Sequence, residues 1–110
     1  MRLPNAEAAI VDIQKLRGYC LSPIHAEGKH KARVFFSALG MTAKDAEELR
    51  KMLKQAAVSN EASVGGMDEF GVRYILDFAA QRRGRSARVR SCWIIRSQEL
   101  NPRLVTCYIL

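Results

Sequence analysis

The sequence predicts an α+β fold in which about three N-terminal helices pack on one face of a small antiparallel β-meander of three to four strands. Apolar residues recur at helical spacing in the first half of the chain and alternate every second residue in the second half. A segment rich in glycine, serine and asparagine, 59–66, separates the halves. Helices that precede the strands, rather than alternating with them, are typical of α+β folds. A chain of 110 residues has the length of one domain, 1–110, with a helical half at about 1–58 and a β half at about 67–110.

Start and stop signals support three separate helices. Asp12 is a suitable N-cap for the first, although Asn5 would cap a longer helix that begins earlier. Gly40 is placed to end the second helix in a left-handed conformation, and Thr42 with Asp45 resembles a capping box before the third. The apolar stripes of the helices are Ile13, Leu16, Tyr19 and Cys20; Ala32, Phe35, Phe36 and Leu39; and Ala46, Leu49, Leu53 and Ala57.

Three alternating runs predict the strands, at 72–78, 87–96 and 103–110. The first two are joined through 82–86, where Gly84 can adopt a positive φ. Alternation in the third run places four residues on one face: Leu104, Thr106, Tyr108 and Leu110. A meander is the simplest topology, and helices on one face leave the other partly free for a polar site.

The charge of the chain is strongly positive and concentrated in the second half. Lysine and arginine number 18 against 11 aspartate and glutamate residues, a net charge of +7 that favours phosphates or an acidic protein as partner. Arg88, Arg90 and Arg96 alternate onto one face, and no acidic residue lies between 78 and 98. We therefore expect this face to contact phosphate or an acidic partner, and Trp93, on the other face, to lie in the core.

Several classes of protein are disfavoured by the sequence. No apolar segment reaches the roughly 18 residues of a membrane span, and Glu7 and Asp12 interrupt the start where a signal peptide is apolar, so we expect a cytoplasmic protein. Cys20, Cys92 and Cys107 are odd in number and widely spaced, which predicts buried free thiols rather than disulfides or a zinc knuckle.

The densest set of reactive side chains lies in 22–31, which contains His25, Lys29, His30 and Lys31. Histidines exchange protons near neutral pH and lysines stabilise charge developing on a phosphate, the two functions that metal-independent RNA cleavage requires. No carboxylate or cysteine at ligand spacing completes a zinc site with the two histidines, so we expect no metal or other cofactor. A solvated basic loop is the alternative interpretation.

Three segments resemble a bacterial domain of unknown function: 19–36, the step Phe70-Gly71-x-x-Tyr74, and 103–108. Its pattern Leu-x-Pro-x-His-x-x-Gly-x-x-Lys-Ala is met by Leu21, Pro23, His25, Gly28, Lys31 and Ala32. This domain occurs alone, often encoded beside an antitoxin-like partner, and as the C-terminal module of toxin-like and phage-associated proteins. The helices before a small sheet, with Thr-x-Tyr near the end, are also loosely similar to the barnase, EndoU, colicin and RelE class of ribonuclease toxins.

This second resemblance implies a metal-independent endoribonuclease toxin that cleaves RNA by 2′-hydroxyl attack and is paired with a small acidic antitoxin protein. His25 is then the first candidate base or acid, with His30 as its substitute, and Lys31 stabilises the phosphorane-like charge. Thr106 and Tyr108 position the phosphate. The residues expected to contact RNA phosphates are Lys29, His30, Arg88, Arg90 and Arg103.

Two alternatives to the ribonuclease remain open. The first is a non-catalytic basic module that uses its arginine face to bind nucleic acid or an acidic protein. The second is a structural or adaptor domain. The class of RNA substrate and the oligomeric state do not follow from the sequence.

Overall fold

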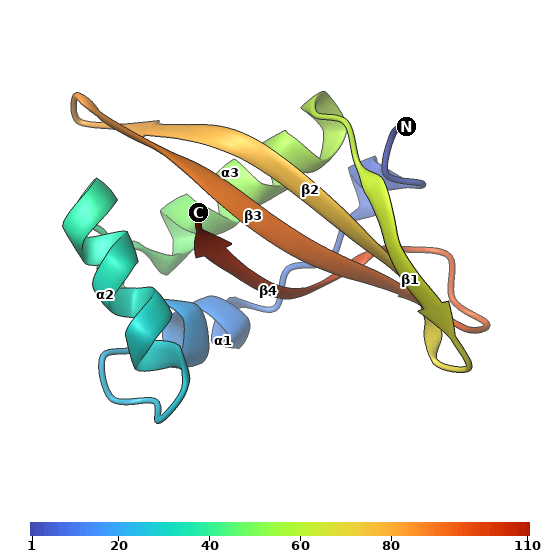
Figure 1. The fold of residues 1–110 in the computed structure, drawn as a ribbon, viewed down its shortest axis with the longest axis horizontal. Helices are drawn as coiled ribbons and strands as arrows, with labels where there is room; N and C mark the ends of the chain where they lie inside the picture. Colours follow the sequence, from blue (N-terminus) through green and yellow to red (C-terminus); the bar gives the residue numbers. More distant parts are fainter.

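The computed structural model describes residues 1–110 and confirms the predicted α+β class. The four strands form one antiparallel sheet in the order β1-β2-β3-β4, a meander, and α3 lies behind it while α2 lies beside β4 (Figure 1). The strands are β1 (Ser63–Asp68), β2 (Gly71–Arg82), β3 (Arg85–Arg96) and β4 (Arg103–Ile109). The helices are α1 (Ile13–Lys15), α2 (Gly28–Leu39) and α3 (Ala46–Ser59).

The helices begin and end where their capping residues predicted. Asp12 accepts a hydrogen bond from the Gln14 amide, and α1 continues directly into a π-helical turn, Leu16–Cys20, so together they cover the first predicted helix. Gly40 ends α2 with φ 66°, and Thr42 and Asp45 form the capping box before α3. A separate single turn, Ala6–Ala8, follows Asn5.

The core lies between α3 and the face of the sheet that carries Leu76, Val89 and Trp93. Trp93 is 1% exposed, as its position in the alternation predicted. Its indole N–H donates to the Ser91 hydroxyl at 2.9 Å, and that hydroxyl donates to the Leu76 carbonyl at 2.6 Å. Both polar groups are thus satisfied inside the apolar layer.

One strand, β1, lies in the segment predicted to be only a connection. Ser63 to Asp68 pair with β2, with an irregular register between Val64 and Gly66. Positions 65 and 66 are glycine and have no side chains that could show an alternation. The strand is therefore recognisable only from its pairing with β2.

The predicted common face of Leu104, Thr106 and Tyr108 is wrong. Trp93 pairs with Leu104 whereas the preceding Cys92 pairs with Thr106, so β4 carries an irregularity at this point. An extra residue reverses the alternation beyond it. Leu104 therefore faces the core, and Thr106 and Tyr108 face the opposite side of the sheet, across from Cys92 and Arg90.

A buried arginine anchors the end of the long β2–β3 hairpin. The Arg82 side chain is 4% exposed and pairs with Glu48 at 2.8 Å and Asp45 at 3.1 Å. It also donates to the carbonyls of Leu39 and Gly40, which end α2. The hydrogen bond that Arg82 donates to Glu48 raises the pKa of Arg82. Through these contacts one cation holds together the hairpin, α2 and the start of α3.

Cys20 and Cys107 are buried and Cys92 is half-buried, and all three are free thiols. None of the helices combines the length and apolar character needed to cross a membrane.

Candidate functional site

A polar cluster forms where α2 meets the free face of the sheet at β4. The Lys31 ammonium, from α2, donates a 3.1 Å hydrogen bond to the Tyr19 hydroxyl in the π-helical turn. Its Nζ also lies 5.7 Å from the centre of the Tyr108 ring, from β4. Three elements therefore converge on one cation, and two of the residues predicted for the site, Lys31 and Tyr108, are brought together.

Gly28 permits this close approach of α2 to the preceding turn. A Cβ atom at this position would lie 2.1 Å from the Tyr19 carbonyl oxygen, far inside van der Waals contact. Only glycine lets the first turn of α2 lie against Tyr19, and this contact carries Lys31 to the Tyr19 hydroxyl.

His25 lies at the mouth of the cluster with one ring nitrogen already occupied. Its Nδ1 accepts hydrogen bonds from the amides of Glu27 and Gly28, at 3.1 and 3.0 Å, which satisfies free N–H groups at the start of α2. The ring meets Tyr19 edge to face, with centroids 4.8 Å apart and an interplanar angle of 86°. With Nδ1 accepting, the hydrogen of the neutral ring resides on Nε2. His25 therefore presents a donor to a ligand.

Thr106 contacts the cluster through a buried cysteine. Its Oγ1 lies 3.7 Å from the Cys20 sulfur. Cys20 also contacts Cys107, and Cys107 faces the opposite side of the sheet from Thr106. Because Cys20 reaches residues on both faces, the π-helical turn that contains it lies at the β4 edge of the sheet. The hydrogen bond between the two thiols lowers the pKa of Cys20 and raises that of Cys107.

His25, Tyr19 and Thr106 line one hollow of about 670 Å³ that opens to solvent. Its other lining residues are Asp12, Gln14, Lys15, Glu27 and Val105. The lining is mainly polar, which suits a hydrated, charged ligand rather than an apolar one.

The Lys31 ammonium keeps its charge at neutral pH. Its hydrogen bond to Tyr19 is the largest influence and raises the pKa of Lys31 above its ordinary value. A lysine with a raised pKa is unsuited to accept protons but well suited to stabilise negative charge. The charge-stabilising role of Lys31 stays a prediction.

The arginine face is less free than its sequence indicated. Arg90 forms a bidentate pair with Asp77, with both bonds at 2.9 Å, because the two residues are directly opposed across β2 and β3. The lack of an acidic residue in 78–98 therefore does not leave Arg90 unpaired, because the carboxylate comes from the neighbouring strand. The hydrogen bonds from Arg90 lower the pKa of Asp77. Arg88, two residues away, is exposed and makes no ion pair.

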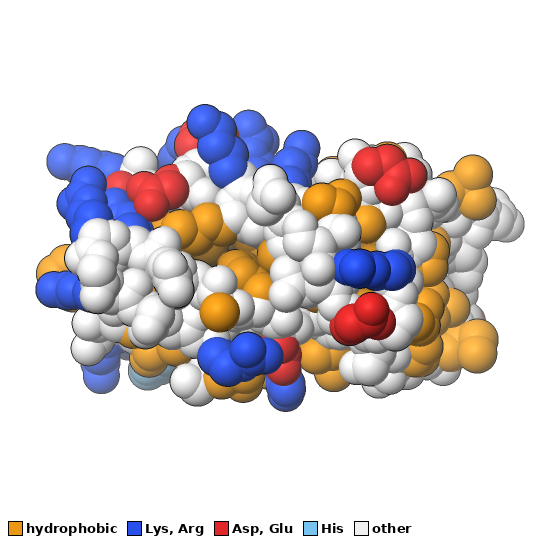
Figure 2. Space-filling view, turned by 90° about the horizontal axis from the view of Figure 1, so that it is seen from above, with side chains coloured by type: hydrophobic (Ala, Val, Ile, Leu, Met, Phe, Trp, Pro, Cys, Tyr) orange, Lys and Arg blue, Asp and Glu red, His pale blue; other side chains and the backbone are white.

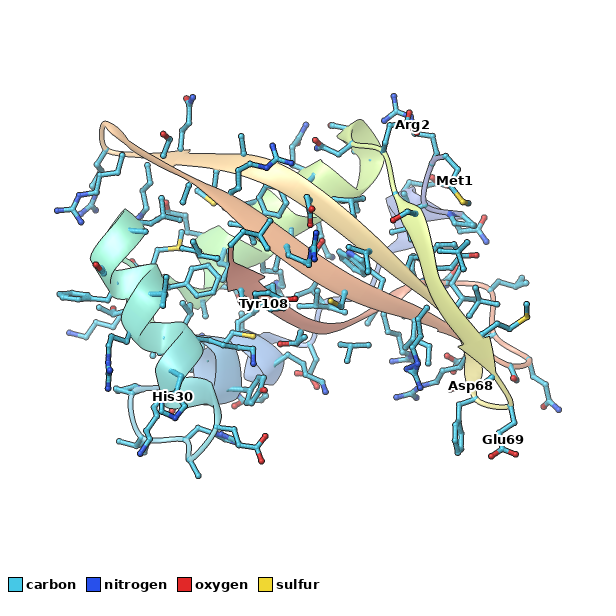
Figure 3. All side chains as sticks on the ribbon, viewed as in Figure 1. Met1, Arg2, His30, Asp68, Glu69 and Tyr108 are labelled. Atoms are coloured by element: carbon cyan, nitrogen blue, oxygen red, sulfur yellow. The ribbon has the colours of Figure 1, made fainter.

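Three other predicted phosphate contacts lie away from the cluster. Arg103 pairs with Glu99 at 3.0 Å and is five residues from Tyr108 along β4, about 17 Å at the rise of a strand. Lys29 and His30 are exposed on the first turn of α2. Figure 3 shows His30 on the outer part of α2, while Tyr108 lies at the centre of the molecule.

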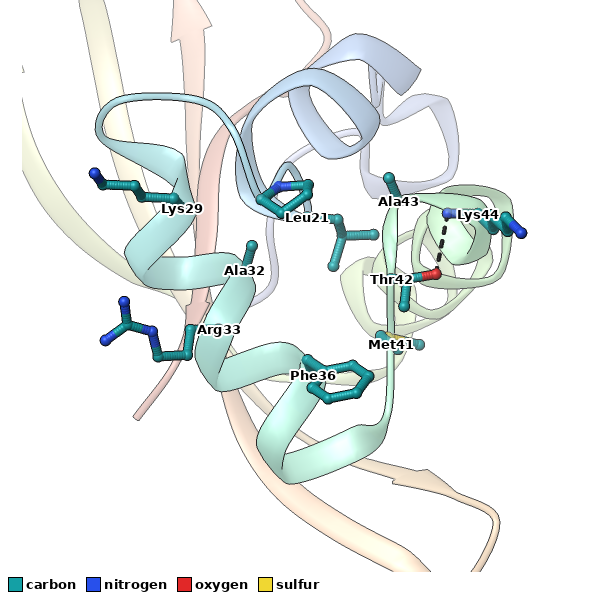
Figure 4. Close-up of a pocket in the computed structure, with 10 residues that line it drawn as sticks. Leu21, Lys29, Ala32, Arg33, Phe36, Met41, Thr42, Ala43 and Lys44 are labelled. Atoms are coloured by element: carbon teal, nitrogen blue, oxygen red, sulfur yellow. Dashed lines mark hydrogen bonds between the residues drawn. The ribbon is translucent and has the colours of Figure 1, made fainter.

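A second, more apolar hollow of about 580 Å³ lies between α2 and the segment that leads into α3. Leu21 and the 60% exposed Phe36 point into it, whereas Lys29, Arg33 and Lys44 lie around its rim (Figure 4). None of these three cations forms a salt bridge, so the hollow joins an apolar floor to an uncompensated positive rim.

Sequence reasoning missed the roles of Tyr19, Cys20 and Asp77. Tyr19 and Cys20 read as members of an apolar helical stripe, and only the packing of α2 shows that the Tyr19 hydroxyl faces Lys31. The position of Asp77 in the alternating run could have predicted its contact with Arg90. Once the two-residue turn between Arg82 and Arg85 is known, counting back along the hairpin places Asp77 opposite Arg90.

The chain belongs to the family described as domain of unknown function DUF6883, whose model matches residues 2–110. Its structure is similar to a chain of a contact-dependent growth inhibition toxin–immunity protein complex from Klebsiella pneumoniae 342, with a TM-score of 0.65 and 15% sequence identity. The alignment covers 92% of this chain and 99% of that chain. At this identity the likeness shows a shared fold. The sequence matched none of the curated proteins with which it was compared.

Proposed function

We propose that this protein is a metal-independent endoribonuclease toxin of a bacterial toxin–antitoxin pair. The observation that supports this proposal best is the convergence of Lys31, Tyr19 and Tyr108 beside the polar hollow that contains His25 and Thr106. The Tyr19 and Thr106 hydroxyls and the His25 ring line this hollow, and the Lys31 ammonium is hydrogen-bonded to Tyr19 beside it. Together these groups match the needs of a phosphate whose negative charge increases during reaction.

The proposed reaction is an internal transfer within the RNA. The 2′-oxygen attacks the adjacent phosphorus and loses its proton, while the bond from phosphorus to the 5′-oxygen breaks and that oxygen gains a proton. The products end in a 2′,3′-cyclic phosphate and a 5′-hydroxyl. Lys31 stabilises the charge on the phosphate, and Thr106 and Tyr108 hold the phosphate in line with the 2′-oxygen.

The contribution of His25 follows from its hydrogen bonds. To accept the 2′-proton on Nε2, the ring must move its own hydrogen to Nδ1 and release the amides of Glu27 and Gly28. Donation of the Nε2 hydrogen to a phosphate oxygen requires no such change. We therefore assign His25 first to phosphate binding and only after this local rearrangement to proton transfer.

Charge and fold support the toxin class. The matched structure is a complex of a toxin with an immunity protein, and both members of such a pair are candidates by fold alone. The net charge of +7 favours the toxin role with the RNA substrate proposed for this chain, since a polyanionic substrate is attracted by a basic surface.

The test is incubation of purified protein with total bacterial RNA in EDTA, followed by analysis of the new ends. Wild type should give fragments that end in cyclic phosphate. Lys31→Ala should lower the cleavage rate by about a hundredfold or more. His25→Ala should also lower it, and Lys29→Ala, which removes the same charge two residues away, should retain it. Intact RNA from folded wild-type protein would contradict the proposal.

The apolar hollow supports a second candidate function, a binding module for an acidic protein such as an antitoxin. Phe36 offers an apolar contact, and Arg33 and Lys44 offer two cations without partners. Protein interfaces combine these features, a central apolar anchor and a charged rim. If growth arrest by the expressed protein persists in Lys31→Ala but is lost in Phe36→Asp, binding rather than cleavage is the function.

A further inference from the structure

The turn of the β2–β3 hairpin and the strand beside it carry a cluster of unpaired positive charge. Arg83, Arg85 and Arg88 are exposed and none forms a salt bridge. The nearest carboxylates are already used, because Asp45 and Glu48 bind the buried Arg82. Figure 2 shows Lys and Arg side chains gathered over the end of the molecule that holds this turn, whereas hydrophobic side chains gather at the opposite end.

The turn is held rigidly but in a costly conformation. Arg82 pairs with Arg85, so the connection consists of Arg83 and Gly84 alone, with φ values of 51° and 79°. A two-residue turn with two positive φ angles favours asparagine or glycine at its first position. An arginine there costs roughly 1 kcal/mol, and its guanidinium forms no salt bridge within the fold.

The chemistry around the turn suits phosphate better than protein. The shallow hollow at the turn, about 400 Å³, is lined by residues 81–86, none of them hydrophobic. A protein partner requires an apolar anchor, which this hollow lacks, whereas the sugar–phosphate backbone requires cations and polar donors. The apolar hollow beside Phe36 has the opposite character.

The position of the turn relative to Lys31 sets a length for the ligand. Tyr108, beside Lys31, pairs with Arg90, and Arg85 lies five residues further along β3. Five residues of a strand span about 17 Å. A stacked strand of nucleic acid advances about 3.4 Å per nucleotide, so about five nucleotides cover this distance.

We propose that Arg83, Arg85 and Arg88 form a second phosphate-binding site that holds RNA about five nucleotides from the phosphate at Lys31. The inference rests on the proposed function for its substrate and deepens it. The protein selects RNA that is long enough to occupy both places, and very short RNAs are bound only at the Lys31 cluster. Arg88 is the closest of the three to Arg90 along β3, and it contacts a phosphate that lies between the turn and the Lys31 cluster.

The test measures binding of 2′-O-methyl RNA, which cannot be cleaved, by fluorescence anisotropy at several salt concentrations. The RNAs are a dinucleotide and a single strand of about 12 nucleotides, longer than the distance between the two places. The variant is Arg83→Asn with Arg85→Gln. Its matched control is Lys54→Gln, which removes an exposed cation without a salt bridge from α3.

We expect the double variant to bind the long RNA roughly tenfold more weakly, with a salt dependence reduced by about 0.7 for each lost phosphate contact. The dinucleotide should bind all variants equally, and Lys54→Gln should behave as wild type. Because Arg83→Asn suits the turn, the single variant should be at least as stable as wild type while its affinity for long RNA falls.

Equal loss of affinity in the Lys54→Gln control, or no loss in the double variant, would overturn the proposal. Competition by a poly-glutamate peptide of equal charge that matches the RNA would also overturn it and identify an acidic protein as the ligand. Binding of uncleavable RNA does not depend on catalysis, so a protein that fails to cleave but shows this pattern overturns the proposed function alone.

Discussion

The ammonium group of Lys31 donates a 3.1 Å hydrogen bond to the hydroxyl of Tyr19, twelve residues earlier in the chain. This bond joins the first turns of α2 to the π-helical turn before it and directs the cation toward Tyr108 on β4. It also raises the pKa of Lys31, so the charge persists through the neutral range. The Tyr19 hydroxyl therefore positions the Lys31 cation.

Tyr19→Phe removes the hydroxyl that holds Lys31. The ammonium loses its fixed position, so the cleavage rate should fall by about tenfold, less than for Lys31→Ala, because the charge itself remains. Cleavage rates on one RNA, together with thermal unfolding, check this. Tyr74→Phe removes a tyrosine hydroxyl in β2, away from the cluster, and should leave the rate unchanged. Equal rates for Tyr19→Phe and wild type would show that the bond is dispensable.

Gly28→Ala should destabilise the protein by at least about 2 kcal/mol, because its Cβ would meet the Tyr19 carbonyl oxygen at 2.1 Å. The start of α2 must move away, so cleavage should fall as well. Gly18→Ala is the matched control: its Cβ would meet only the flexible end of Gln14, at 3.3 Å. Alanine in this helical position should leave stability unchanged or raise it by about 0.5 kcal/mol. Urea unfolding distinguishes the two, and equal stabilities would refute the steric explanation.

Asp77→Asn should make the free energy of unfolding less dependent on pH in the acidic range. The pKa of Asp77 in the folded protein lies below its ordinary value of 3.8, chiefly through hydrogen bonds from Arg90. The ion pair therefore stabilises the fold above that range, and the contribution disappears as pH falls through the lower, folded pKa. Asp77→Asn should cost about 1 kcal/mol at pH 7 and nothing in strong acid.

Urea unfolding of both proteins as a function of pH gives the two curves. Glu7→Gln, at an exposed residue without an ion pair, is the control and should follow wild type throughout. A difference between Asp77→Asn and wild type that stays constant down to strong acid would mean that the carboxylate does not act through its charge.

Arg82→Met should destabilise the protein by about 3 kcal/mol, because it leaves Glu48 and the last carbonyls of α2 without their cation. Amide hydrogen exchange should also rise at the hairpin end. Arg88→Met, at an exposed arginine of the adjacent strand, should change stability by less than about 0.5 kcal/mol. If both variants lose the same stability, the hairpin is not anchored by Arg82.

The helical half was predictable because its signals are local. Asp12, Gly40 and the pair Thr42 and Asp45 act on backbone groups within four residues, so a sequence pattern specifies them without reference to the rest of the chain. The alternation of β2 and β3 was equally direct, since each side chain follows the pleat of its own strand.

The facing of Thr106 and Tyr108 in β4 and the acidic partner of Arg90 were not predictable in this way. The irregularity beside Cys92 depends on how β3 and β4 pair, and it moves Thr106 and Tyr108 to the face opposite Leu104. The pairing of β2 with β3 brings Asp77 to Arg90. Register is a property of two strands together, and alternation in either strand alone does not reveal it.

By itself, the sequence determined the α+β class, the helix ends, the core position of Trp93, and the presence of histidine and lysine at the start of α2. Only the tertiary structure decided that Lys31 meets Tyr19 and Tyr108, and that Arg103 pairs with Glu99 away from this cluster. The physical reason is distance along the chain. Capping and alternation are local forces between near neighbours, whereas a site is made by packing and strand pairing between residues up to 89 positions apart, such as Tyr19 and Tyr108.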